Sequence, residues 1–172
     1  ESAKNAKPQY NMSNTDIKKT LEKVVINIGV GKARQQANFD DKILPEIEKE
    51  IATITGQKAS RRPSRKSEAG FKVRAGNIVG LKTTLRGQRM QDFMDRLNNI
   101  VFPRVKDFRG IDTKHVDGGG NLNIGLVDQF VFPEIDPNTS KVNFGMQITI
   151  VPAIKNREKI IDTYKSIGVP LK

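Results

Sequence analysis

The sequence has no cysteine, no tryptophan and a single histidine, His115. Without cysteine there can be no disulfide and no thiolate metal site, and a metal cluster would have to be built around one imidazole. No apolar run approaches the roughly 18 residues that a membrane-spanning helix needs, and no secretory apolar region lies near Glu1. We therefore expect no metal, no cofactor and no membrane partner.

Catalytic motifs are missing as well. No nucleophile motif, paired-carboxylate site or HExxH motif is present, and Asp40 with Asp41 suits the negative charge that a helix start prefers. His115 is explained more simply by a turn cap or an RNA contact. We expect no catalytic residue; an enzyme would need turnover that depends on His115 or on the turn at 29–32.

One glycine-containing stretch, VVINIGVGKARQQ, is reminiscent of a nucleotide-binding loop. A Walker loop would need glycine where Ile26 stands and Ser or Thr where Ala33 stands. The dinucleotide fingerprint fits Gly29 and Gly31 but meets Arg34 at its third glycine. The stretch therefore predicts a strand that ends in a tight turn, whose exposed amides could still meet another polyanion.

Positive charge is the strongest compositional signal. Lysine and arginine number 30 against 19 acidic residues, which gives a net charge of +11 and an isoelectric point near 10.0. Between 57 and 89 only Glu68 is acidic, whereas the basic residues are Lys58, Arg61, Arg62, Arg65, Lys66, Lys72, Arg74, Lys82, Arg86 and Arg89. A charge run is often only a solvated face. Because this window also holds strand formers, glycines and polar residues such as Thr83, it favours a folded basic sheet that contacts phosphate and sugar.

Hydrophobic periodicity predicts an α+β fold in a single domain. Apolar stripes predict amphipathic helices at 40–56, 88–103 and 156–168, the first capped by Asp40 or Asp41 and the last by Asn156. Strands are expected at 23–28, 59–64, 71–74, 79–86 and 145–151, with a less regular one at 123–132. We expect a mostly antiparallel sheet with helices packed on one face and a basic RNA-binding face opposite.

The segment 105–123 has no clear periodicity and is expected to be a functional or partner-bound loop. Its DGGGN sequence suits a turn cluster or, as the alternative, an anion nest.

Several blocks together resemble a known family. The blocks LEKVVINIGVGKA, ITGQKASRRPSRKSEAGFKVRAGNIVGLKTTLRGQRMQDFMDRL, FPRVKDFRGI, VDGGGNLNIGL, FPEI and GMQITIV occur in the order found in bacterial-type ribosomal protein L five. The resemblance covers roughly Leu21 to the C-terminus, whereas residues 1–20 match weakly and receive no function. It implies a large-subunit protein that binds 5S rRNA in the central protuberance.

The resemblance implies three groups of site residues. Family blocks put Asn27, Gln57, Lys58, Thr84, Arg86 and Arg89 at the 5S rRNA face. The first turn and the basic window add Gly29, Lys32, Arg61, Arg62, Arg65 and Lys82. The extended loop 65–77 resembles one that reaches P-site tRNA through Lys66, Lys72, Val73, Arg74 and Asn77. The segment FPEIDPNTSKVNFGM resembles a bridge to the small-subunit head protein thirteen, with Asp136, Pro137, Asn138 and Asn143, although a plain turn also explains it.

Further partners implied by the resemblance are 23S rRNA and neighbouring central-protuberance proteins, in a cytoplasmic large subunit. The glycine cluster departs from the family pattern, because Val116, Gly119 and Leu122 stand where aromatics and an arginine are usual. A stacking contact from that loop is therefore not expected. The rival interpretation is a free-standing RNA chaperone that uses the same basic sheet and does not co-sediment with large subunits.

Overall fold

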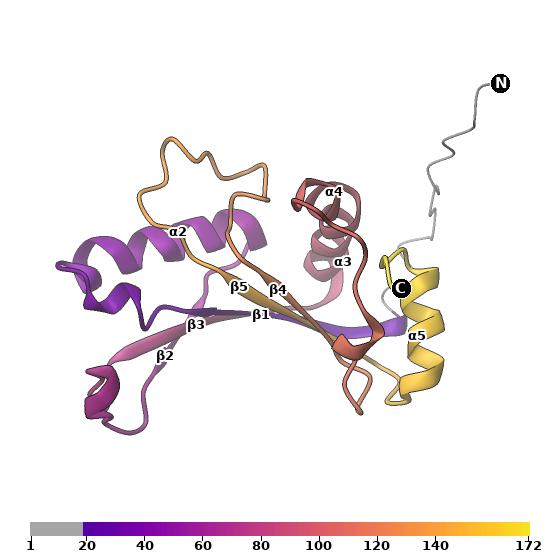
Figure 1. Ribbon diagram of the computed structural model, residues 1–172, viewed down its shortest axis with the longest axis horizontal. Coiled ribbons are helices and arrows are strands. Elements are labelled where there is room, and N and C mark those ends of the chain that lie inside the picture. Colours follow the sequence, from indigo (N-terminus) through magenta and orange to yellow (C-terminus); the bar gives the residue numbers. More distant parts are fainter. Residues whose placement is uncertain (1–18) are drawn as a thin grey trace.

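Five strands form a single sheet in the computed structural model, which describes residues 19–172 (Figure 1). They are β1 (Leu21–Gly29), β2 (Ser60–Pro63), β3 (Ile78–Leu85), β4 (Leu122–Leu126) and β5 (Met146–Pro152). Their order across the sheet is β2-β3-β1-β5-β4, and every neighbouring pair is antiparallel. The expected α+β class with an antiparallel sheet is confirmed. The weakly matched segment 1–20 lies almost wholly outside the described residues.

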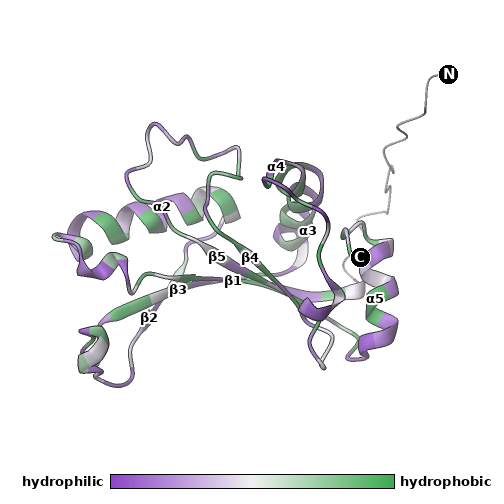
Figure 2. Ribbon diagram, viewed as in Figure 1, coloured by the Kyte–Doolittle hydropathy of each residue, from purple (hydrophilic) through white to green (hydrophobic). Residues whose placement is uncertain are grey.

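All three expected helical segments are present. The π-helical turn η2 (Phe39–Ile43) leads into α2 (Leu44–Thr55), and α3 (Gly87–Arg96) continues through η4 (Leu97–Val101) into α4 (Phe102–Arg104). The last helix is α5 (Arg157–Ser166), and short 3-10 turns are η1 (Ala33–Gln35), η3 (Ala69–Phe71) and η5 (Thr113–His115). Hydrophobic and hydrophilic bands alternate along α2 and α5, as amphipathic helices require (Figure 2).

The capping expectations had different outcomes. The side chain of Asn156 accepts hydrogen bonds from the amides of Glu158 and Lys159, so the expected cap of α5 is confirmed. The expected Asp40 or Asp41 cap is wrong, because the helical stretch begins earlier, at Phe39, and Asn38 occupies the cap position without a side-chain bond. Burial of Phe39 against the core fixes this earlier start.

One face of the sheet is apolar and lies under the helices. The strand register aligns Val24, Ile26 and Ile28 of β1 with Leu85, Thr83 and Leu81 of β3. On the other side of β1, Val24 and Ile26 are aligned with the buried Ile150 and Ile148 of β5. The stripe Leu44, Ile47, Ile51 and Ile54 of α2 is at most 1% exposed. Figure 1 shows α2 and α3 on this side of the sheet. Burial of each such side chain stabilises the fold by roughly 1.5–3 kcal/mol.

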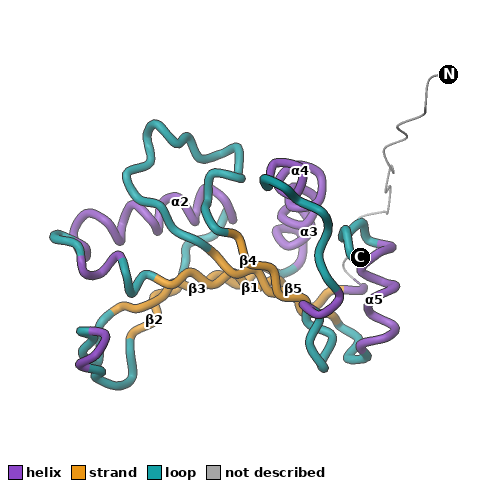
Figure 3. Tube along the Cα trace, viewed as in Figure 1, coloured by secondary structure: helices purple, strands orange, loops and turns teal. Residues whose placement is uncertain are grey.

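Two strand expectations need correction. Residues 71–74 form no strand; Phe71 ends the 3-10 turn η3, and only an isolated bridge joins Glu68 to Val73. Lys72 has a left-handed backbone with φ of 53°, which interrupts extended structure there. The strand expected at 123–132 ends at Leu126, and residues 127–145 form a long connection to β5 (Figure 3).

Candidate nucleic-acid interface

The sheet face opposite α2 and α3 is open. In the described part of the chain no helix covers the central strands on this side (Figure 1). Because side chains alternate along a strand, the residues between the buried ones point to this face. The strand register arranges them in three rows that run across the sheet.

The first row crosses all five strands. Asn27 of β1 is paired with Lys82 of β3 on one side and with Gln147 of β5 on the other. Ser60 of β2 extends the row beyond Lys82, and Gly125 of β4 extends it beyond Gln147. Hydrogen-bonding side chains from four strands therefore stand side by side on the open face.

The second row is also mainly polar. Val25 is paired with Thr84 of β3 and with Thr149 of β5, and Thr149 is paired with Asn123 of β4. The Thr149 hydroxyl donates to Asn123 Oδ1 at 2.8 Å, and Gln147 Nε2 approaches the same oxygen at 3.4 Å. These contacts order the side chains of the β4–β5 half of the face.

The third row consists of Gly29, Gly80 and Arg62. Gly29 faces Gly80 across β1 and β3, and Gly80 faces Arg62 of β2. A Cβ at Gly29 would meet no atom within 4 Å, so the backbone is bare toward solvent there. A sugar-phosphate chain could lie close to this part of the strands, with the exposed Arg62 beside it.

A second cluster of predicted residues lies where β3 leads into α3. Gln57 Nε2 donates to the Thr84 carbonyl at 3.2 Å, and Arg89 Nη1 donates to Gln57 Oε1 at 3.3 Å. Lys58 and Arg86 are exposed and close to this cluster in sequence. The structure thus brings Gln57, Thr84 and Arg89 together, although 32 positions separate Gln57 from Arg89.

Arg61 lies on the other side of the sheet from Arg62. It is paired with Leu81, whose side chain is buried under the helices. Its Nε donates to Glu48 Oε1 at 2.6 Å and its Nη2 to Oε2 at 3.0 Å, which forms a bidentate ion pair with α2. This hydrogen bond lowers the pKa of Glu48 despite the opposing effect of burial. The guanidinium is therefore already neutralised within the protein.

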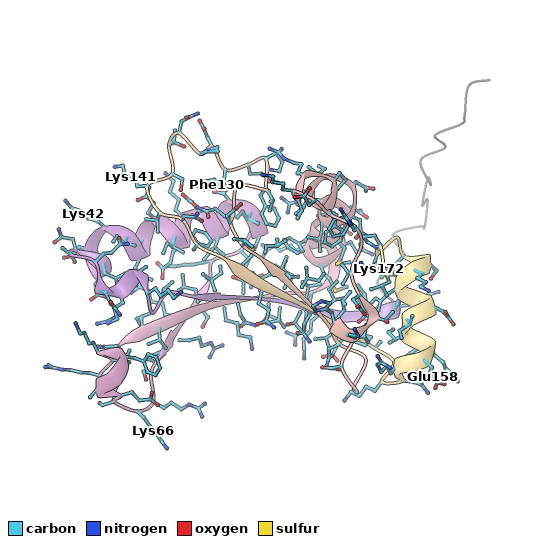
Figure 4. The ribbon with its side chains drawn as sticks, in the orientation of Figure 1. Lys42, Lys66, Phe130, Lys141, Glu158 and Lys172 are labelled. Atoms are coloured by element: carbon cyan, nitrogen blue, oxygen red, sulfur yellow. The ribbon has the colours of Figure 1, made fainter. Side chains whose placement is uncertain are left out.

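The loop 65–77 joins β2 to β3 and is held by its own backbone. The Ser64 amide donates to the Asn77 carbonyl at 2.8 Å, and the Gly76 amide donates to the Ser64 carbonyl at 2.9 Å. Residues 65–72 and 74–76 are exposed, and Lys66 points away from the sheet (Figure 4). Val73 and Asn77 are half-buried, so the lysines and arginines are the accessible part of the predicted tRNA-facing set.

The turn after β1 holds Lys32 near this loop. The Val30 amide donates to the Val79 carbonyl at 3.0 Å and thereby ties the end of β1 to β3. Lys32 is exposed, whereas Arg34 lies over the Phe39 ring at 5.7 Å and is 3.6 Å from Asp40. Lys32 is thus the more accessible cation of this turn.

The long connection between β4 and β5 carries the predicted bridge residues. Asp136 Oδ1 accepts from the Asn138 amide at 2.9 Å, which makes a local turn, and Asp136, Pro137, Asn138 and Asn143 are all exposed. The fully buried Gln129 holds this connection to the core. Its Nε2 donates to the Val142 carbonyl at 2.6 Å, and its Oε1 accepts from the Phe144 amide at 3.0 Å.

The DGGGN turn is closed by its own aspartate. Asp117 Oδ1 accepts from the amides of Gly119 and Asn121, both at 2.9 Å, and Oδ2 accepts from the Asn121 side chain at 2.9 Å. The side-chain bond from Asn121 is the main reason why the pKa of Asp117 lies below its ordinary value. The amides of an anion nest are thus already used, which favours the turn interpretation.

Sequence reasoning missed part of the open face. Ser60, Asn123, Gln147 and Thr149 were not predicted, although the alternation in NLNIGL and GMQITIV carried the signal. Within residues 19–172 no cluster of three or more metal-ligating side chains occurs, and His115 is an exposed residue of η5. No helix of that region has the length and apolar character to cross a bilayer.

Two family models match the chain. Residues 18–74 match the model described as Ribosomal protein L5, and residues 78–171 match the model that describes the C-terminus of the same ribosomal family. Strands from both matched segments join in one sheet, because β1 pairs with β3 and with β5.

Curated relatives agree with the family models. A protein of Fusobacterium nucleatum named "Large ribosomal subunit protein uL5" is 46% identical over 152 residues, which are 88% of this chain and 81% of the relative. Its namesake from Pseudothermotoga lettingae is 43% identical over 95% of this chain and 87% of the relative. A third, from Rubrobacter xylanophilus, is 40% identical over 96% and 90% of the two chains.

Proposed function

Because the chain belongs to the ribosomal protein L5 family, we propose that it is a structural component of the large ribosomal subunit that binds 5S rRNA. The role makes and breaks no covalent bond and operates in cytoplasmic ribosomes. Within the subunit the chain anchors 5S rRNA in the central protuberance, beside 23S rRNA and neighbouring proteins.

The composition of the open sheet face carries this proposal. None of the positions in its three rows bears a carboxylate, whereas Lys82, Arg62, amides and hydroxyls are spread across it. The opposite face is filled by the core and cannot take a ligand. A surface of cations and hydrogen-bonding groups suits phosphates and 2′-hydroxyls, which are the groups that structured RNA exposes.

The energetic mechanism is neutralisation of phosphates with release of counterions. If the protein contacts about six phosphates, a plot of the logarithm of the affinity against the logarithm of the salt concentration has a slope of roughly −4 to −5. Specificity comes from RNA shape and unpaired bases, because the deep major groove of an A-form helix excludes side chains.

Two loops extend the proposed contacts. The loop 65–77 reaches P-site tRNA through its exposed cations Lys66, Lys72 and Arg74. The turn at Asp136 and the neighbouring exposed Asn143 meet the small-subunit head protein thirteen and form an intersubunit bridge. The organised backbone of each loop supports this assignment, since a preordered loop loses less entropy on binding.

The decisive experiment is filter binding of the purified chain to 5S rRNA and to a size-matched unrelated structured RNA at several salt concentrations. We expect a preference for 5S rRNA that persists near physiological salt. Equal and salt-sensitive binding to both RNAs would contradict the proposal. It would instead indicate a general RNA-binding domain, such as that of an RNA chaperone.

A further inference from the structure

A groove separates the turn after β1 from the loop that joins β2 to β3. Its volume is about 450 Å³, within the roughly 300–1,000 Å³ typical of small-molecule sites. Segments far apart in sequence form its walls. The lining residues are Gly31, Lys32, Gln35, Ser64, Glu68, Phe71, Val73 and Val79.

The aromatic ring at this groove is unusually exposed. Phe71 is 71% exposed and is the single aromatic among the large exposed hydrophobic residues of the described chain. Its position does not result from a loose loop, because Glu68 and Val73 exchange backbone hydrogen bonds of 2.8 and 3.2 Å around it. The left-handed Lys72 completes the turn. The fold thus holds an aromatic face in water, where it is available for stacking.

The glycine on the opposite wall is not required by the protein itself. Gly31 has no positive φ, and a Cβ added there would meet no atom within 4 Å. A side chain would instead project into open space beside the groove. Glycine at this point leaves room for a ligand to approach the backbone closely.

The charges around the groove identify the kind of ligand. Lys32 and Lys72 flank it, and within residues 19–172 neither lies within ion-pair distance of a carboxylate. Glu68 is a lining residue, and a carboxylate can accept from the two N–H groups on the Watson–Crick edge of guanine. An exposed aromatic ring, flanking cations and a hydrogen-bond acceptor are together typical of a site that binds an unstacked nucleobase.

We propose that this groove binds one unpaired nucleobase of an RNA, with a preference for guanine. The base stacks on Phe71, Glu68 accepts from its Watson–Crick edge, and Lys32 and Lys72 contact the adjoining phosphate. The choice of RNA as the ligand rests on the proposed function. The site adds base recognition to a loop whose proposed tRNA contacts are made by the exposed cations Lys66, Lys72 and Arg74.

The test is an NMR titration of the full chain with GMP, AMP, CMP and UMP, with ribose 5-phosphate as the base-free control. We expect saturable shifts of the Gly31, Phe71 and Val73 signals, strongest with GMP and missing with ribose 5-phosphate. Equal shifts with ribose 5-phosphate, or none with any nucleotide, would overturn the proposal.

Variants separate the roles of the lining residues. Phe71→Ala should weaken GMP binding roughly 5- to 150-fold, the range for loss of one base–aromatic stack. Glu68→Gln should abolish the preference for GMP over AMP. Gly31→Ala should weaken binding, whereas Gly118→Ala, also at a glycine with open space and no positive φ, should not. Unchanged GMP binding by both Phe71→Ala and Gly31→Ala would refute the site.

Binding of 5S rRNA by the same preparations distinguishes this inference from the proposed function. Phe71→Ala should retain 5S rRNA affinity within about two-fold, because Phe71 is outside the predicted 5S rRNA-binding set and its removal leaves the neighbouring Lys32, which is in that set, in place. If 5S rRNA binds normally but no nucleotide shifts the NMR signals of the groove residues, only the groove site is refuted. If nucleotides shift those signals but 5S rRNA is not bound selectively, the proposed function is refuted and the groove site stands.

Discussion

Arg61 of β2 and Glu48 of α2 form a bidentate ion pair, with nitrogen–oxygen distances of 2.6 and 3.0 Å. The pair fastens the edge strand β2 to the helix layer. The side chain of Glu48 is only 10% exposed, whereas that of Arg61 is 52% exposed. The contact consequently links the edge of the predicted RNA-binding sheet to the core. Its loss should therefore change the free energy of unfolding more than it changes the affinity for RNA.

Removal of the Glu48 charge should alter acid stability. The Arg61 hydrogen bond lowers the folded-state pKa of Glu48 below its ordinary value of 4.5. Its stabilising effect is therefore complete above the unfolded-state pKa and is lost as the pH falls through the depressed folded-state pKa. The free energy of unfolding, measured with urea between pH 7 and pH 3, should fall less steeply toward acid pH for Glu48→Gln than for the unmodified chain.

Glu22→Gln is the matched control for this change. Glu22 also has a lowered pKa, chiefly through its hydrogen bond to Lys23, but its side chain is 46% exposed. The control should leave the stability nearly unchanged, since exposed ion pairs contribute little. An equal effect of the two substitutions would contradict a special role for the Arg61–Glu48 pair.

Neighbouring arginines should differ in RNA binding. Arg62→Ala removes from the open face a cation that has no ion-pair partner among residues 19–172, and it should make the salt slope for 5S rRNA binding shallower by roughly 0.7–0.9. Arg61→Ala removes the same charge from the helix-facing side, where Glu48 already neutralises it. Filter binding across salt concentrations should show a smaller slope change for Arg61→Ala. Identical slopes for the two variants would contradict the proposed face.

Gln129 should be essential for the long connection before β5. Gln129→Leu deprives the Phe144 amide of its partner and removes one of two donors to the Val142 carbonyl, which keeps the Ser140 hydroxyl at 3.0 Å. The loss of the bond to the buried Phe144 amide should lower the free energy of unfolding by about 1–3 kcal/mol. Faster amide exchange at Phe144 should accompany the loss. Gln88→Leu is the control, because Gln88 is exposed and its side-chain amide donates to the Asp92 carboxylate at the surface. Unchanged urea unfolding of Gln129→Leu would show that the connection is held by other contacts.

Thr83 offers a stabilising substitution. It is 2% exposed, faces Ile26 under the helices, and its hydroxyl has no hydrogen-bond partner in the described residues. Thr83→Val replaces the hydroxyl with a methyl group of similar size and should raise the stability by about 1 kcal/mol. The melting temperature should rise by roughly 2–4 °C.

The contrasting substitution is Thr55→Val. The Thr55 hydroxyl donates to the Ile51 carbonyl at 2.7 Å, so its removal should lower the melting temperature. A fall in melting temperature for Thr83→Val as large as that for Thr55→Val would mean that Thr83 has a polar partner after all.

The parts of the fold that could be predicted are those in which several residues follow the same hydrophobic periodicity. The stripe of α2 and the alternation of β1 and β5 were readable because each buried position recurs at the period of its element. The segment 71–74 was misread, because its residues have strand propensity but a left-handed Lys72 and a local 3-10 turn prevail. Local turn geometry is not encoded in propensity alone.

The sequence by itself determined the basic composition, the positions of the helices and the resemblance to a ribosomal family. Only the tertiary structure decided which arginine of β2 faces the open side, because all four residues of that strand are exposed and no buried alternation sets its phase. Pairing of β1 with β3 likewise brings Gly31 to the loop that carries Phe71, 40 positions later. A groove between such distant segments exists only once strand pairing has set their separation.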